Sequence, residues 1–268
     1  MGKVIAVCTS DRKGLQKHDV NTAHFSAEWG IDGDAHAGSW HRQVSLLSAD
    51  KIEAFNKRGA NVIPGAFGEN LVVEGFDFRA LPVGTLLRCG DVLLEMTQIG
   101  KECHSHCEIY KKMGECIMPR EGVFARVIEP GSISVGDEMS IEKREGHFPW
   151  QAAVITLSDK AAAGERKDES GPAIAKRLRE ASYEVVEEIV IPDDERVLKQ
   201  QLIRLCDQRQ LDLILTTGGT GCSARDITPE ATIAIADKNV PGIAEAMRAE
   251  SLKITRHAMI SRAASVIR

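Results

Sequence analysis

The stretch Leu211-Asp-Leu-Ile-Leu-Thr-Thr-Gly-Gly-Thr-Gly221 joins a short apolar run to a glycine-rich turn, and it decides the fold of the second half of the chain. Apolar runs of this length that end in glycine are typical of buried strands. Two earlier runs, Ala152–Leu157 and Glu184–Ile191, predict further strands, and amphipathic segments with the helical period separate the three. Strands that alternate with helices predict an α/β domain with a largely parallel sheet.

Four helices are expected around these strands. Proline favours the first turn of a helix, so Ser170-Gly-Pro172 marks one helix start. The others are predicted over about residues 195–209, 228–237 and 243–253. Residues 261–268 look like the start of another strand.

The first half carries a different pattern, because its apolar segments are short and punctuated by glycine. Strands are predicted at Lys3–Cys8, Gln43–Leu47, Asn70–Val73, Thr85–Arg88, Val92–Thr97, Val123–Val127 and Glu138–Ile141. Only Ala49–Lys57 reads as a clear helix. This spacing indicates a β-barrel or a sandwich. We therefore expect a mostly β domain over residues 1–143, a linker over 144–151 and the α/β domain over 152–268.

Composition narrows the functional classes. The 268 residues carry a net charge of −5 and are 43% apolar, which indicates a globular protein with no general attraction to nucleic acid or to an anionic membrane. The first residues turn polar by Thr9, too early for a secretory signal, and no apolar run reaches about 18 residues. A cytoplasmic location is expected.

The glycine loop is a candidate phosphate cradle. Thr217, Gly218, Gly219, Thr220 and Gly221 follow a strand, where backbone N–H groups can close on an anion. A Walker loop is excluded, because Cys222-Ser223 stands where lysine is needed. The dinucleotide pattern matches over 219–224, but it follows the third strand and not the first, which disfavours hydride chemistry. Plain turn glycines remain the alternative.

Carboxylates gather at the same edge of the sheet. Asp226 beside a phosphate cradle is repulsive unless a divalent cation lies between them, so it is a candidate Mg²⁺ ligand, with an Asx-turn as the alternative. Asp193 and Asp194 reach this edge too, and one of them is expected to cap the next helix. Thr228 is expected to cap the helix that begins at Pro229.

These motifs together resemble the molybdopterin adenylyltransferase family over about residues 152–268. The resemblance is carried by Thr217–Gly221, Arg225–Glu230, Pro241–Arg248 and the corner Pro192–Asp194. It implies ATP- and Mg²⁺-dependent transfer of AMP to the terminal phosphate of molybdopterin, commonly by a trimer.

The resemblance also implies roles for particular residues. Asp226, with Asp193 or Asp194, would hold Mg²⁺ and the reacting phosphates. The cofactor would be bound by Thr217, Gly218, Gly219, Thr220, Gly221, Arg225, Thr228, Glu245 and Arg248, the last two of which would lie near the pterin. Family members continue with a strand, a substrate loop and a helix beyond the position of Arg268, so this domain is expected to be incomplete at its carboxyl end. A non-catalytic pterin carrier is therefore an alternative.

Cysteines cluster in the first domain. Cys103, Cys107 and Cys116 fall within fourteen positions together with His104 and His106, a set that can hold a soft metal. The spacing lacks a repeated C-x₂-C knuckle, and immediate neighbours cannot easily bind one metal together. A zinc-stabilised interaction protein and plain buried cysteines stay open as alternatives.

The first domain resembles the MOSC family over nearly all of residues 1–143. The motifs are Gly30–Gly38, His41–Leu47, Gly65–Leu71, Leu81–Gly84, Thr97-Gln98 leading to Cys103, and the turn Gly131–Asp137. This resemblance implies a β-barrel that binds molybdenum cofactor or a related pterin. Cys103 matches the cysteine that ligates molybdenum or accepts sulfur in some members.

Several neighbours are expected to assist Cys103. A thiolate is a soft ligand and a nucleophile, and His104, His106 or Lys101 could stabilise it, with Cys107 and Cys116 in support. Further candidates bind the ligand itself. Arg42 and Arg120 suit a pterin phosphate, with ordinary surface ion pairs as the alternative, and His36 and His41 flank a glycine turn, where structural roles are equally open.

Both resemblances point to molybdenum cofactor biosynthesis. The second domain would activate molybdopterin with AMP, and the first would bind, sulfurate or deliver the cofactor, with handover favoured by fusion. Expected partners are ATP, the pterin, a molybdenum-insertion protein and molybdoenzymes, but neither nucleic acid nor a membrane. Covalent pyridoxal phosphate is not expected, because MOSC-type sulfurases carry it in a separate domain.

Overall fold

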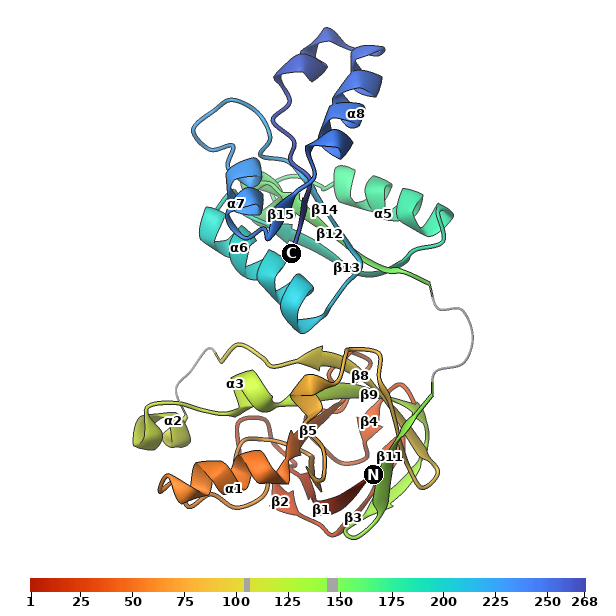
Figure 1. Ribbon diagram of the computed structural model, residues 1–268, viewed down its shortest axis with the longest axis vertical. Coiled ribbons are helices and arrows are strands. Elements are labelled where there is room, and N and C mark those ends of the chain that lie inside the picture. The colour runs from red at the N-terminus through yellow and green to blue at the C-terminus, as the bar shows by residue number, and fades with distance from the viewer. Residues whose placement is uncertain (104–106, 144–148) are drawn as a thin grey trace. The chain divides into compact units, whose positions relative to one another are not determined.

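The computed structural model describes residues 1–103, 107–143 and 149–268 (Figure 1). The chain divides into two compact units, Met1–Gly146 and His147–Arg268. Part of the predicted linker, residues 144–148, lies outside the described residues, and Gln151 at its end already belongs to a strand. Within the described ranges no helix is long and apolar enough to cross a membrane.

A closed barrel of seven strands forms the first unit, in the order β11-β7-β8-β9-β5-β6-β1 with β1 pairing back onto β11. Its strands are β1 (Gly2–Thr9), β5 (Val44–Ser48), β6 (Leu71–Glu74), β7 (Leu86–Cys89), β8 (Val92–Ile99), β9 (Val123–Glu129) and β11 (Glu138–Glu142). Only the β5–β6 pair is parallel among these pairings. Each of the seven predicted strands corresponds to one of them, and the barrel is confirmed over the sandwich.

Alternation of side chains explains the barrel. One apolar cluster takes every second residue from the strands, such as Leu71 and Val73 of β6, and fills the interior. Residues between them, such as Val72, face outward and join a second cluster under helix α1 (Ala49–Lys57), which contributes Ile52 and Phe55. The predicted helix Ala49–Lys57 is confirmed.

Several short elements had not been predicted. They are β2 (His18–Asp19), β3 (Thr22–Ser26), β4 (Gly30–Ile31), β10 (Gly131–Ser134), the 3₁₀ turn η1 (Phe78–Ala80), α2 (Glu108–Met113) and α3 (Met118–Glu121). Strand β3 pairs with β10, more than a hundred residues away, and β4 pairs with β3. Because such strands depend on distant partners, their local sequence carries little signal.

The second unit is built on a parallel sheet of three strands, in the order β13-β12-β14. These are β12 (Gln151–Leu157), β13 (Glu184–Ile191) and β14 (Leu213–Thr217). Helix α5 (Ser170–Glu180) packs on one face through Ala175 and Leu178. Helices α6 (Glu195–Ile203) and α7 (Thr228–Ala234) cover the other face (Figure 1).

The remaining elements of this unit refine or correct the prediction. They are α4 (Asp159–Ala162), the π-helical turn η2 (Arg204–Gln208), β15 (Lys238–Asn239), α8 (Pro241–Leu252), the 3₁₀ helix η3 (Arg256–Ile260) and β16 (Val266–Ile267). The helix predicted over 195–209 is thus α6 followed by a π-helical turn, and the one predicted to residue 237 ends at Ala234. The strand expected within 261–268 is only β16, which pairs antiparallel with β15 outside the parallel sheet.

Candidate functional site

The glycine loop follows β14 and turns sharply. Gly218 and Gly219 have φ values of +95° and +60°, which side chains other than glycine rarely adopt. A Cβ atom on Gly219 would lie 2.5 Å from Oγ1 of Thr228 and 3.7 Å from Oδ1 of Asp193. Glycine is therefore needed at position 219 so that the start of α7 can approach the loop.

Two carboxylates flank this loop. Asp226 accepts a hydrogen bond from the backbone N–H of Ser223 at 2.8 Å, and its Oδ2 lies 2.9 Å from where a Cβ on Gly221 would stand. Hydrogen bonds from Ser223 lower the pKa of Asp226. Burial raises the pKa of Asp193, and the negative charge of Asp226 raises it further. The two side chains are thus close enough to repel each other across the loop.

Asp194 has a different task from Asp193. It is the N-cap of α6, and its Oδ1 accepts from the N–H groups of Arg196 at 2.8 Å and Val197 at 3.0 Å. The expectation that one of the pair caps the helix is confirmed. A carboxylate engaged in this way is less available to a ligand, which leaves Asp193 to face the loop.

Thr228 does not cap α7 as predicted. It is the first residue of that helix, Ile227 occupies the cap position, and the Thr228 hydroxyl donates to the carbonyl of Gly218 at 2.9 Å. Its backbone N–H donates to the carbonyl of Gly219 at 3.1 Å. The nearby loop carbonyl competes successfully for the hydroxyl, so Thr228 fastens the glycine loop to the helix.

Asp159, which the sequence prediction missed, belongs to the same edge. Its carboxylate accepts from the N–H of Asp193 at 2.9 Å, and its own N–H donates to Asp193 Oδ2 at 3.4 Å. It also forms an ion pair with the exposed Arg225. The signal was available, because Asp159 follows the carboxyl end of β12 as Asp193 follows that of β13.

Arg262 was also missed, and it ties the loop to the last segment of the chain. Its Nε donates to the carbonyl of Gly221 at 2.6 Å, and its other nitrogens contact the carbonyl of Asp226 and the carboxylate of Glu230. Arg248 donates to the carbonyls of Ser261 at 3.4 Å and Ala263 at 3.1 Å, holding the segment that contains Arg262. Glu245 is exposed on α8.

A cavity of about 620 Å³ opens beside the loop. Its lining consists of Asp193, Asp194, Glu195, Arg196, Lys199, Gln200 and Ile203. The cavity therefore starts at the carboxylate corner and runs along α6, where two cationic side chains border it. Its size lies within the range of sites that take ligands of nucleotide size.

The predicted cysteines come together in the first unit. Cys103, Cys107 and Cys116 line one cavity of about 320 Å³, together with Tyr110, Gly114, Glu115, Pro119 and Arg120. The thiols are free, and burial raises the pKa of Cys116. His104 and His106 lie outside the described residues. Among the residues that are described, no group of three His, Cys, Asp or Glu is arranged to hold a metal.

The two predicted arginines occupy different places. Arg120 lines the cysteine cavity, where it donates to Glu115 at 2.7 Å. The guanidinium of Arg42 lies over the ring of Trp40, 4.7 Å from its centroid, and 5.6 Å from the centroid of Phe124.

Hydrogen bonds connect the histidine turn to the cysteine segment. His41 Nε2 lies 2.9 Å from Oε1 of Gln98, whose amide donates to the carbonyl of Gly100 at 2.7 Å. The hydroxyl of Thr97 donates to the carbonyl of His41. The end of β8 is therefore fixed to the turn that carries His41, and the chain proceeds from there to Cys103.

Comparison with known proteins assigns both units. Residues 33–140 match the model of the MOSC domain, and residues 153–268 match a family described as a probable molybdopterin binding domain. Residues 33–140 thus form a MOSC domain, and residues 153–268 form a domain of the family described as probable molybdopterin binding.

The relatives match the molybdopterin-binding domain. The molybdopterin adenylyltransferase of Haemophilus influenzae is 41% identical over 117 residues, which are 43% of this chain and 59% of that protein. The protein of the same name from Helicobacter pylori is 42% identical over 117 residues, 43% of this chain and 66% of its own length. The chain thus spans less than two thirds of these relatives. A solved structure of the molybdopterin biosynthesis enzyme MoaB from Thermus thermophilus is 41% identical, with 44% of this chain and 75% of that chain covered and a TM-score of 0.42.

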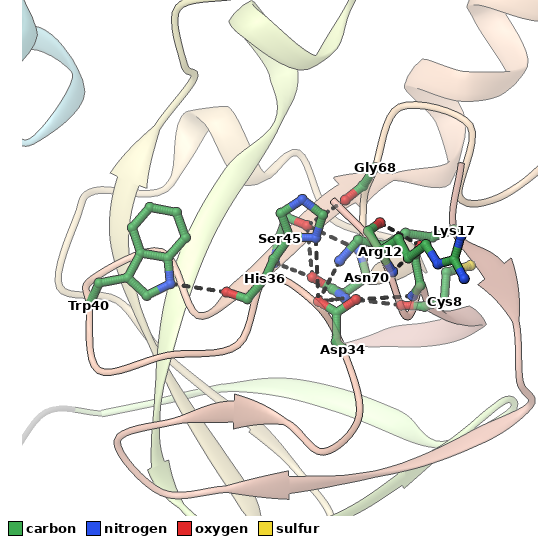
Figure 2. Close-up of polar contacts among 10 residues, drawn as sticks. Cys8, Arg12, Lys17, Asp34, His36, Trp40, Ser45, Gly68 and Asn70 are labelled. Atoms are coloured by element: carbon green, nitrogen blue, oxygen red, sulfur yellow. Dashed lines mark hydrogen bonds and ion pairs between the residues drawn. The ribbon is translucent and has the colours of Figure 1, made fainter. Parts of the chain in front are cut away.

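The MOSC domain also contains a buried polar network that was not predicted (Figure 2). Asp34, fully buried, accepts from Lys17 Nζ at 2.7 Å, from the N–H of Ser10 at 3.1 Å and from the amide of Asn70 at 3.2 Å. Burial alone would raise the pKa of Asp34, but the donors around it, His36 and Lys17 foremost, hold it well below its usual range. The network joins three loops of the MOSC domain beneath the histidine turn.

Proposed function

We propose that the molybdopterin-binding domain transfers AMP from ATP to molybdopterin with Mg²⁺, and that the MOSC domain binds the cofactor beside Cys103. The observation that carries the first part is the placement of Asp193 and Asp226 against the glycine loop. Two relatives named molybdopterin adenylyltransferase, at 41% and 42% identity, support the same reaction.

The loop supplies a cradle for the phosphates. Backbone N–H groups at the end of a parallel strand bind phosphate without a lysine, since their partial charges converge on the anion. Thr217 and Thr220 belong to this loop, and Arg225 stands exposed beside it. The cavity along α6, where Arg196 and Lys199 stand among three carboxylates, offers room for the rest of the nucleotide.

The carboxylate pair fits a divalent cation. Burial is the main cause of the raised pKa of Asp193, and the charge of Asp226 adds to it, so a cation between the two carboxylates would remove their repulsion. Asp193 and Asp226 would hold Mg²⁺, because Asp194 already accepts two backbone N–H groups as the cap of α6. Bound Mg²⁺ would neutralise charge on the reacting phosphates.

The chain's own residues then act mainly by positioning. A terminal phosphate oxygen of molybdopterin attacks the α-phosphorus of ATP, the bond from that phosphorus to the bridging oxygen breaks, and pyrophosphate leaves. Thr228 and Arg262 keep the loop in place during this step. Glu245 and Arg248 of α8 would face the pterin.

The Asp226→Asn variant tests the assignment, because it keeps the shape of the side chain and removes its charge. The purified chain is incubated with ATP, Mg²⁺ and molybdopterin, and the adenylylated pterin is separated by chromatography. Product should form with the wild-type chain and with Asp237→Asn, an exposed carboxylate of the same unit, and should disappear with Asp226→Asn. If pterin is retained by the wild-type chain without product, the domain is a carrier and the enzymatic proposal is wrong.

For the MOSC domain we propose that Cys103 is the functional thiol, a ligand of molybdenum or an acceptor of sulfur. Its support is the cavity that it shares with two further thiols and Arg120. Bound molybdenum and persulfide should be lost in Cys103→Ser and kept in Cys222→Ser, which alters an exposed cysteine of the other unit. Equal amounts of bound molybdenum and persulfide in the two variants would exclude Cys103 as the functional thiol.

A further inference from the structure

Trp40 is a large aromatic side chain that remains 39% exposed at the end of the glycine turn of the MOSC domain. The turn carries His36 and Gly38 before it and His41 and Arg42 after it. The indole therefore lies among polar side chains that can bind a ligand resting on its ring. Neither the proposed reaction nor the thiol chemistry at Cys103 requires this side chain.

Three contacts fix the orientation of the indole. Its Nε1–H donates to the carbonyl of His36 at 3.1 Å (Figure 2). The guanidinium of Arg42 lies over the ring, 4.7 Å from its centroid. The ring of His41 meets it edge-on, with centroids 6.2 Å apart. These contacts orient the ring, while 39% of the residue stays exposed to solvent.

The support beneath the turn is equally firm. Asp34 and Ala37 belong to the same turn, and Asp34 is anchored by the fully buried Lys17. His41 is bonded to Gln98, which leads along the chain to Cys103. A ligand that rests on Trp40 would thus lie on a preorganised surface. The hydrogen bonds that hold this surface extend to Gln98, five residues before Cys103.

We propose that Trp40 is a stacking platform for the planar ring of a pterin phosphate in the MOSC domain. Pterin and indole are each two fused rings, so one can cover the other, and stacking on an aromatic side chain favours binding of a planar ring. The carbonyl of His36 holds the edge of this platform through the indole Nε1–H. The inference rests on the proposed function and adds the group that recognises the ring.

Fluorine NMR on the full chain tests the platform at a single residue. The chain holds three tryptophans, Trp29, Trp40 and Trp150, so labelling with 5-fluorotryptophan gives three resonances, which single Trp→Phe variants assign. The probe is an oxidised pterin that carries a side-chain phosphate, with inorganic phosphate and AMP as separate arms. A stacked ring shifts only the resonance of the indole that it covers.

The Trp40 resonance should shift saturably with the pterin phosphate, while those of Trp29 and Trp150 stay in place and inorganic phosphate has no effect. A Trp40 resonance that does not move while pterin binds would overturn the inference. An equal shift with AMP would overturn the choice of a pterin.

A second measurement follows the fluorescence of the pterin, excited where tryptophan does not absorb. Contact with the indole should quench it in the wild-type chain and in Trp29→Leu, a matched exposed tryptophan of the same unit, and the quenching should be lost in Trp40→Leu. Equal quenching in Trp40→Leu would contradict the platform. Adenylylation by the other domain does not depend on Trp40, so an active chain without these signals would refute this inference and leave the proposed reaction standing.

Discussion

At the scale of single residues, Arg262 decides how firmly the glycine loop is held. Its planar guanidinium reaches the carbonyls of Gly221 and Asp226 and the carboxylate of Glu230 together. Lysine has one compact ammonium group and cannot reproduce this fork. We expect Arg262→Lys and Arg262→Ala both to lower kcat about 10- to 100-fold with little change in the KM for ATP, because misplacement of a catalytic loop acts on the reaction step.

Steady-state adenylylation kinetics check this prediction. Arg256→Ala, an exposed arginine of the same terminal segment, serves as the control. If Arg262→Ala retained the kcat of that control, the positioning role of Arg262 would be excluded.

The buried Asp34 of the MOSC domain makes a prediction about pH. Its folded-state pKa is depressed, so its contribution to stability is present above its unfolded pKa of about 3.9 and is lost as the pH falls toward the folded value. Asp34→Asn leaves Lys17 buried without its counter-ion, and breaking such a pair costs about 3–5 kcal/mol. The free energy of unfolding of the variant should therefore be much lower at pH 7, and its difference from the wild type should narrow below about pH 4.

Denaturant unfolding at a series of pH values measures this difference. The exposed Asp50 gives the matched variant Asp50→Asn, for which only a small effect is expected. A gap between wild type and Asp34→Asn that stayed constant from pH 7 to pH 3 would show that the Asp34 charge does not contribute as described.

At the scale of elements, the local sequence pattern predicted the helices and strands that are recognisable from a few neighbouring residues. The barrel strands and α1 were found because alternation and helical period are visible within a few residues. The pairing of β3 with β10 was missed because the two strands lie more than a hundred residues apart, and no local pattern connects them. At the candidate site, Asp226 and Asp193 stood out because they follow strands or glycines. Arg262 did not, since only the fold brings it to a loop some forty residues earlier.

At the start of α6, Asp194 caps the helix and the neighbouring Asp193 faces the glycine loop. Asp194 accepts two backbone N–H groups there, so Asp194→Ala should lower the free energy of unfolding of the second unit by about 1 kcal/mol, and Asp194→Asn should restore most of it. Asp193→Ala should cost less, because it also removes repulsion with Asp226. Denaturant unfolding followed by circular dichroism compares the three. A larger loss of the free energy of unfolding in Asp193→Ala than in Asp194→Ala would contradict the assignment of Asp194 as the helix cap.

At the scale of the whole molecule, the change of pattern near residue 144 predicted two units, and the structure divides the chain within the same region. Each unit has apolar clusters of its own. The pattern of apolar residues on each side of residue 144 could therefore be interpreted independently. The MOSC domain and the molybdopterin-binding domain lie on one chain, and linkage raises the concentration of one site near the other.

The most direct test of the central claim follows the phosphorus atoms of ATP. The full chain is incubated with molybdopterin, Mg²⁺ and ATP labelled at either the α- or the γ-phosphorus, and the pterin product is isolated. The proposed reaction predicts that α-label enters the pterin in an amount equal to the pyrophosphate released, that γ-label leaves entirely with pyrophosphate, and that neither occurs with Asp226→Asn. Label from the γ-phosphorus on the pterin, or no transfer of α-label by the wild-type chain, would contradict it.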